Sequence, residues 1–359
     1  MADLGEFETV EADKALAAEQ TKTADARRER DAAKHALQSA MGQVEEMERR
    51  MAFLEGLANL DPTPPKWLAP TERSAGNRAI AYAPGSDWHL DEVVNPDEMN
   101  GVNAFDRDIA IARLRRYYEK QVVLARDHLA GLTWEGIVHP LNGDLFSGDI
   151  HEELSDTNAA PLLQSIDFWV EHVAAGIEML AEEFGKVHVP VTPGNHGRRS
   201  RKSRMKGRAV DNFDWFFGRI LARMFSDDDR VTFQIPESFD IQYDIYDLTI
   251  RQEHGDAFKG GSGIAGIWSP IARGHAKRSA RGVSTDRPFD LLSIGHFHTL
   301  IFGPEWIING SLKGYDEYAA ISGFSFEPPA QAFAVVTPEH GITWRAPIFC
   351  ADPKAEGWK

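Results

Sequence analysis

The sequence predicts an α/β fold in which a two-sheet β-sandwich is flanked by helices and preceded by an N-terminal helical extension. Helix-like and strand-like segments alternate from residue 79 to about residue 225, and strand-like segments dominate from there to residue 345. Alternation followed by a run of strands is typical of layered α/β domains. Before residue 60 the chain is rich in Ala, Glu, Lys, Arg and Gln and has no Pro, which favours helix.

The second half of the N-terminal extension carries a seven-residue apolar pattern. Apolar residues recur at the a and d positions of about three heptads, with charged residues outside them. The expected seam consists of Leu37, Ala40, Val44, Met47, Met51, Leu54 and Ala58. It predicts a coiled coil that makes the protein a homo-oligomer or binds a partner protein. A single helix that packs back on the chain's own body is the alternative.

A proline-rich stretch separates this extension from the rest of the chain. Four prolines lie between residues 61 and 70, which predicts an extended and fairly stiff spacer. We therefore expect four parts: a helix or coiled coil over 1–60, a linker over 61–77, a main domain over 78–350 and a C-terminal tail over 351–359.

Composition excludes several classes of protein. The net charge of −16 argues against a protein that coats nucleic acid through its overall field, although local basic patches can still bind a polyanion. The single cysteine, Cys350, excludes an internal disulfide and a cysteine-based zinc cluster, so metal ligands must be His, Asp, Asn or Glu. No apolar run of about 18 residues and no apolar signal core occur, so we expect no membrane span and a cytoplasmic location.

The main domain divides into predicted elements by its apolar periodicity. Long segments with apolar residues at helical spacing predict helices over 105–130, 160–184 and 213–225. Short apolar runs predict strands over 79–83, 136–141, 187–191, 231–235, 241–251, 289–294, 306–308, 332–336 and 342–345.

Five polar clusters each follow directly after a predicted strand. They are Ser86-Asp87-Trp88-His89, Asn142-Gly143-Asp144, Gly194-Asn195-His196, His254-Gly255-Asp256 and Gly295-His296-Phe297-His298. A single cluster of this kind is more often a turn or a structural histidine than a ligand. Sites in open α/β sheets form outside the carboxyl ends of the strands, so we expect the five clusters to converge.

The order of these clusters resembles the calcineurin-like metallophosphoesterase family: Asp-x-His, Gly-Asp, Gly-Asn-His, a lone His and Gly-His-x-His. The resemblance covers about 210 residues and implies two stacked sheets flanked by helices, with two metal ions. It implies that one ion is held by Asp87, His89 and His298, that the other is held by Asn195, His254 and His296, and that Asp144 bridges both. It places His196 at the substrate, where it protonates the leaving oxygen or stabilises the charged phosphorane.

The chemistry of these ligands supports the same interpretation. Imidazole and carboxylate groups suit Mn²⁺, Fe²⁺ or Zn²⁺ better than Ca²⁺ or Mg²⁺ alone, and we expect two divalent ions, with Mn²⁺ favoured. Two such ions can lower the pKa of a bridging water and clamp both oxygens of an in-line displacement at phosphorus. Such a water nucleophile needs no Ser or Cys from the protein.

The sequence departs from the family pattern beside the catalytic histidine. Many phosphomonoesterases of the family carry an acidic residue three positions after the Gly-Asp pair and another directly after Gly-Asn-His; here Ser147 and Gly197 stand there. Asp149 is a possible substitute. His151 is near enough in sequence to line the site, but the start of a helix explains His151 and Glu152 better.

Dense positive charge follows the catalytic histidine. Residues 198–208 contain seven Lys or Arg, and a second basic segment spans 273–281. Because Lys and Arg neutralise backbone phosphates without sequence preference, we expect the first segment to bind substrate through Arg198, Arg199, Arg201, Lys202 and Arg204. Trp88, Phe146, Phe258 and Trp268 are candidates for base stacking or for core packing. The alternative for the basic loops is an exposed charged surface, or a contact with the acidic N-terminal helix.

These features together predict a metal-dependent phosphodiesterase, most simply a DNA nuclease similar to the repair exonucleases of the family, with nucleic acid as substrate. The alternatives are a phosphomonoesterase that acts on phosphoprotein or nucleotide, and a non-catalytic adaptor with the same fold. The complete ligand set argues against the adaptor.

Overall fold

The computed structural model describes residues 77–259, 266–352 and 354–356, together with most residues between 22 and 48. The chain divides into two units, Met1–Thr71 and Glu72–Lys359, and each is treated by itself. In the first unit, the described residues between 22 and 48 are helical, as the composition predicts. Of the predicted seam, Leu37, Ala40, Val44 and Met47 are exposed there. The remaining seam positions (Met51, Leu54 and Ala58) and the predicted linker up to residue 76 lie outside the described residues, so the coiled coil stays a prediction.

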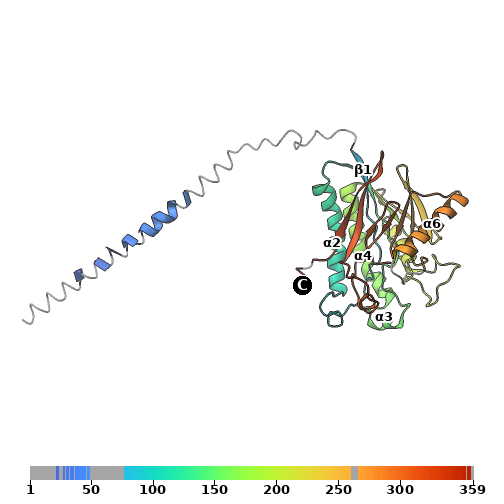
Figure 1. The fold of residues 1–359 in the computed structure, drawn as a ribbon, viewed down its shortest axis with the longest axis horizontal. Coiled ribbons are helices and arrows are strands. Elements are labelled where there is room, and N and C mark those ends of the chain that lie inside the picture. Colours follow the sequence, from blue (N-terminus) through green and yellow to red (C-terminus); the bar gives the residue numbers. More distant parts are fainter. Residues whose placement is uncertain are drawn as a thin grey trace, which may run out of the picture. The chain divides into compact units, whose positions relative to one another are not determined.

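The second unit is built on two β-sheets (Figure 1). The first has the order β11-β10-β1-β2-β3-β4. Strands β1 to β4 are parallel to one another, β10 is antiparallel to β1, and β11 is antiparallel to β10. Its strands span Arg78–Tyr82 (β1), Thr133–Val138 (β2), Val187–Pro190 (β3), Val231–Gln234 (β4), Ala330–Thr337 (β10) and Gly341–Phe349 (β11).

The second sheet has the order β5-β6-β7-β9-β8, in which β6, β7 and β9 are parallel. Its strands span Asp240–Ile245 (β5), Leu248–Glu253 (β6), Leu291–Ile294 (β7), Ile301–Phe302 (β8) and Trp306–Ile308 (β9). The two sheets face each other, because one buried cluster contains Ala332 and Ala334 of β10 together with Ile250 of β6.

Helices cover the outer faces of both sheets. The large core cluster joins the first sheet to α2 (Arg107–Val123), α4 (Leu162–Phe184) and α5 (Phe213–Met224); α2 continues into a π-helical turn, η1 (Leu124–His128). A smaller cluster packs α6 (Trp268–Ser284) on the second sheet through Ile271, Leu292 and Ile294. Short helices α3 (Glu152–Thr157) and α7 (Glu317–Ile321) complete the unit. Figure 1 shows α2 and α4 on one side of the strands and α6 on the other.

This architecture confirms the predicted two-sheet fold flanked by helices, and the helix caps explain where two of its helices begin. Asp106 accepts a hydrogen bond from the backbone N–H of Ile109 at the start of α2, and Asn212 accepts one from Asp214 at the start of α5. Such caps satisfy backbone donors that have no partner inside the helix.

Two details of the predicted elements are wrong or incomplete. The expected strand over 241–251 is a hairpin of β5 and β6, turned at Tyr246, whose φ is 54°. A tyrosine in the left-handed region gives no Gly or Pro signal from which the turn could be recognised. The basic segment over 273–281 lies within helix α6, and β8 and α7 were not expected.

Candidate metal site

The structure brings the five predicted clusters together at the carboxyl ends of parallel strands. Asp87 and His89 follow β1, Asp144 follows β2, and Asn195 and His196 follow β3. From the second sheet, His254 follows β6, and His296 and His298 follow β7. Ligand atoms of these residues form three overlapping groups, each within 4.8 Å: Asp87, His89 and His298; His89, Asp144 and His196; and Asp144, His254 and His296.

The backbone at the site adopts a conformation that non-glycine residues seldom use. Among the described residues, nine non-glycine residues have positive φ, and five of them are predicted metal ligands: Asp87, His89, Asp144, His296 and His298. Left-handed backbone at Asp or His costs free energy and concentrates at functional sites. Here it turns ligand side chains toward a common point.

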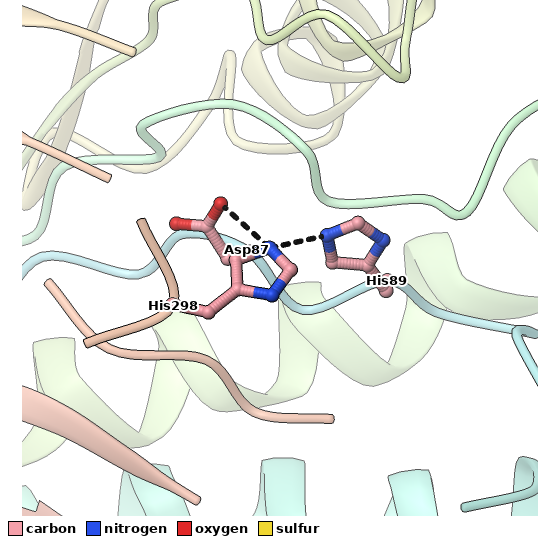
Figure 2. A group of neighbouring side chains, drawn as sticks. All are labelled: Asp87, His89 and His298. Carbon is pink, nitrogen blue, oxygen red and sulfur yellow. Dashed lines mark hydrogen bonds and ion pairs between the residues drawn. The ribbon is translucent and has the colours of Figure 1, made fainter. Parts of the chain in front are cut away.

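The first group consists of Asp87, His89 and His298 (Figure 2). Nε2 of His89 lies 3.1 Å from Nε2 of His298, which in turn lies 3.5 Å from Oδ1 of Asp87. The Asp87 carboxylate is fully buried and accepts hydrogen bonds from the backbone N–H of His296 and from the hydroxyl of Ser86. These bonds hold the carboxylate in place.

The second group consists of Asp144, His254 and His296. Nε2 of His254 lies 2.8 Å from Oδ2 of Asp144 and 4.0 Å from Oδ1 of Asp87. Nδ1 of His254 lies 2.9 Å from the backbone carbonyl of Asn142, to which it donates, so Nε2 is left to bind a metal. Asp144 also forms a group with His89 and His196, so its carboxylate lies near members of both groups.

The residues present fit divalent cations. The side-chain oxygen of Asn195 is buried and has no hydrogen-bond partner among the described residues. A buried polar atom without a partner is costly, and an amide oxygen beside carboxylates and imidazoles is a suitable cation ligand. This orphaned oxygen is at the position that the motif pattern assigns to the second ion.

The electrostatics of the site also favour cations. Burial lowers the pKa of His89 and of His296 to about 4, so both imidazoles stay neutral and able to coordinate. Burial raises the pKa of Asp87 to about 7, and the nearby Asp144 carboxylate adds to that rise. Burial acts to lower the pKa of His254, but Asp144 raises it to about 10. The two buried carboxylates of Asp87 and Asp144 thus have only one nearby positive charge, that of the His254 imidazolium.

His196 lies at the centre of the site and has a fixed orientation. Nδ1 of His196 donates to the carbonyl of Ser147 at 2.7 Å, and its backbone N–H donates to Oδ1 of Asp144 at 2.6 Å. Its ring centroid is 4.6 Å from that of His89. The Ser147 carbonyl thus orients the ring in place of an acidic side chain, whereas the suggested substitute, Asp149, is exposed. His151 begins α3, as expected, but its ring is also 5.8 Å from that of His196.

Sequence reasoning missed two groups of supporting residues. Buried Glu92 lies 3.0 Å from Nδ1 of His89 and accepts a hydrogen bond at 2.6 Å from buried Lys313, which also pairs with Asp316. The buried carboxylate of Asp214 accepts hydrogen bonds from the backbone N–H groups of Gly194, Asp144 and Leu145. Neither group of supporting residues is marked by a motif in the sequence. Glu92 and Lys313 are 221 positions apart, and Asp214 reads only as a first-turn residue of α5.

Of the predicted substrate residues, Arg198 and Arg204 line a pocket together with Asn195, whereas two of the others have acidic partners. Arg199 pairs with Asp211 at 3.2 Å, Arg201 pairs with Glu152, and Lys202 is exposed. In the second basic segment, Arg278 pairs with Glu253. Of the aromatic candidates, Trp88, Phe146 and Phe258 belong to the core, and only Trp268 is exposed. Stacking by the three core residues is therefore wrong.

Comparisons with known proteins find likeness only at the level of solved structures. No family model matches the sequence, and no curated protein matches it. A conserved uncharacterized protein from Streptococcus pneumoniae, described as a predicted phosphoesterase, is 12% identical with a TM-score of 0.27, over 75% of this chain and 97% of that one. Vps29 from Entamoeba histolytica, solved with Zn²⁺, is 12% identical with a TM-score of 0.29, over 75% of this chain and 99% of that one.

A third structure, the sulfate thiohydrolase SoxB from Thermus thermophilus, is 10% identical with a TM-score of 0.29, over 77% of this chain and 57% of that one. Scores at this level carry no argument about activity. The motifs and their convergence decide the resemblance. The chain resembles the calcineurin-like metallophosphoesterases. Among the described helices, none has the length and apolar character needed to cross a bilayer.

Proposed function

We propose that the protein is a dinuclear metal-dependent phosphodiesterase. The observation that supports this most directly is the convergence of the five strand-end clusters into three overlapping groups of candidate ligand atoms, two of which share Asp144. Asp87, His89 and His298 would hold one ion, and Asn195, His254 and His296 would hold the other. Manganese suits this mixed donor set, and iron or zinc would also fit.

Bound ions would supply a strong nucleophile at neutral pH and an electrophile for the phosphate oxygens. The chain itself supplies the positioning. Ser147 fixes Nδ1 of His196, which leaves Nε2 as the atom that gives a proton to the leaving oxygen. Glu92, which is paired with Lys313, contacts the ring of His89 and orients it. Asp214 accepts hydrogen bonds from the backbone of the two loops that carry Asp144 and Asn195 and so holds them in place.

We further propose that the substrate is a nucleic-acid strand, with DNA favoured. Two features support a polyanion. The basic loop 198–208 directly follows His196, and a pocket at its base includes Asn195, a proposed metal ligand. Arg and Lys beside the chemistry would neutralise phosphates on either side of the bond that is cleaved.

A substrate panel tests this function. Purified protein with Mn²⁺ is offered labelled single- and double-stranded DNA, RNA, p-nitrophenyl phosphate and its bis-ester. We expect turnover of the bis-ester and of a nucleic acid. Turnover of the monoester alone would contradict the phosphodiesterase and favour the phosphomonoesterase. Tightly bound metal with no turnover of any substrate would favour the adaptor.

A variant at His196 tests the proposed acid. We expect His196→Ala to keep its metal content and to lose turnover by about 10²-fold or more, because proton transfer to the leaving oxygen is lost. Metal content is measured by elemental analysis of dialysed protein. Full activity in this variant would contradict the role of His196.

A further inference from the structure

A pocket beside Asn195 is lined by some arginines of the basic loop and not by others, which gives these arginines different roles. It begins at Asn195 and is lined by side chains of the loop that follows His196, chiefly Arg198, Ser200, Ser203, Arg204 and Arg208. We call it the arginine pocket. Asp211 and Asp256 complete its polar lining, and no aromatic side chain lines it in the described part of the chain. A base therefore has nothing to stack on there, whereas an anion has several donors.

Two of the arginines shape the arginine pocket. The guanidinium of Arg198 donates to the backbone carbonyls of Ser200 and Arg201, both at 2.9 Å, and so curls the loop back on itself. Arg208 binds the carboxylate of Asp256, which follows the ligand His254 by two positions. The loop is thus fixed at one end by its own backbone and at the other by the chain segment that carries a metal ligand.

Of the three arginines that line the arginine pocket, Arg204 is the one that remains most available to a ligand. Its only acidic contact among the described residues is a loose one, 3.9 Å to Oδ2 of Asp211, and its side chain is 69% exposed. Asp211 is also the partner of Arg199, at the shorter distance of 3.2 Å. Three guanidinium groups face two carboxylates in the arginine pocket, which leaves a net positive charge beside the proposed metals.

We propose that the arginine pocket binds a second phosphate of the substrate, the one that neighbours the phosphodiester being cleaved. This rests on the proposed phosphodiesterase function and names its substrate as a strand with at least two phosphates. Arg204 is the direct contact. Arg199 and Arg201 are outside the arginine pocket, paired with Asp211 and Glu152. Phosphate is the anion that guanidinium and hydroxyl groups bind without reading sequence.

The test compares Arg204→Ala with Arg199→Ala in the full chain with Mn²⁺. Both variants remove one exposed positive charge that contacts Asp211, so they are matched in charge and loop position. The substrates are bis(p-nitrophenyl) phosphate, which has one phosphate, and a trinucleotide, which has two. We expect Arg204→Ala to raise KM for the trinucleotide about 10-fold. Its effect on the bis-ester, which has no second phosphate, should be much smaller, and Arg199→Ala should raise KM for the trinucleotide by much less than Arg204→Ala.

The outcomes separate this inference from the proposed function. If the wild type hydrolyses both substrates and the two variants behave alike, the arginine pocket is not a phosphate site. If the wild type hydrolyses neither, the phosphodiesterase is wrong. In that case the inference is tested by the affinity for a fluorescent phosphorothioate trinucleotide. Arg204→Ala must weaken this binding more than Arg199→Ala does. Adding ADP as a competitor distinguishes a strand from a nucleoside diphosphate: an Arg204 effect on ADP alone would overturn the strand assignment.

Discussion

Replacement of Gly194 by alanine is the sharpest test of how the site is assembled. Gly194 packs directly on Asp144, the carboxylate between the two ligand groups. A Cβ added at Gly194 would lie 2.8 Å from the carboxyl carbon of Asp144, and closer still to its Oδ1 and its backbone nitrogen. Ordinary contacts begin near 3.4 Å. The carboxyl carbon must therefore move by at least about 0.6 Å, and the two nearer atoms by more.

The expected loss follows from that displacement. Misplacing a catalytic group by about 1 Å can cost about 10²-fold in rate, so we expect Gly194→Ala to lose about 10²-fold in turnover at saturating Mn²⁺. Overpacking should also cost about 1–3 kcal/mol in the free energy of unfolding. Hydrolysis of the bis-ester, metal content by elemental analysis and urea unfolding measure the three effects.

Gly131→Ala is the matched control. A Cβ at Gly131 meets nothing within 4 Å, and its backbone is outside the left-handed region. This variant should keep the activity and stability of the wild type. The reasoning is refuted if Gly194→Ala binds both metals with wild-type affinity and keeps turnover within about 3-fold, since Asp144 would then tolerate the displacement that the structure requires.

Three further predictions concern groups around the site. Glu92→Gln should weaken Mn²⁺ binding by about 10–100-fold in a calorimetric titration, because His89 loses the carboxylate that orients it. Removing divalent metal with a chelator should lower the melting temperature, and Mn²⁺ at about 100 times its Kd should restore about 2.7 kcal/mol. Burial lowers the pKa of His139 to about 4, so its neutral form stabilises the fold above pH about 6.5. As the pH falls toward 4 this contribution to the free energy of unfolding, up to about 3 kcal/mol, is lost. His139→Asn should flatten that part of the pH dependence of urea unfolding.

The sequence was sufficient for the fold class and for the candidate ligands that the structure brings together, because both depend on local signals. Apart from His254, which follows Arg-Gln-Glu and precedes Gly255, each candidate ligand follows an apolar run that ends near Gly or Pro, and the carboxyl ends of parallel strands meet at one edge of a sheet. The π-helical turn after α2 and the hairpin at Tyr246 contain no Gly or Pro that would mark them.

The contacts behind the site were not predictable for a different reason. Lys313 reaches Glu92 across 221 positions, and Lys is almost never buried unless it is paired. No periodicity marks such a pair, so only the tertiary structure can show it. The arginines are a similar case. Adjacency to His196 predicted Arg198, Arg199, Arg201 and Arg204 as substrate contacts. The partners of Arg199 and Arg201, however, depend on how the loop folds against Asp211 and Glu152.

The strain at the site bears on whether the protein binds cations there. Five left-handed non-glycine residues, at about 1 kcal/mol or more each, cost an amount comparable to the whole stability of a typical domain, about 5–15 kcal/mol. An adaptor that binds no metal gains nothing from Asp87 and Asp144 buried together, from neutral His89 and His296, or from an unpartnered Asn195 oxygen. Each feature becomes favourable when cations bind. These features are therefore best explained by cation binding at this site.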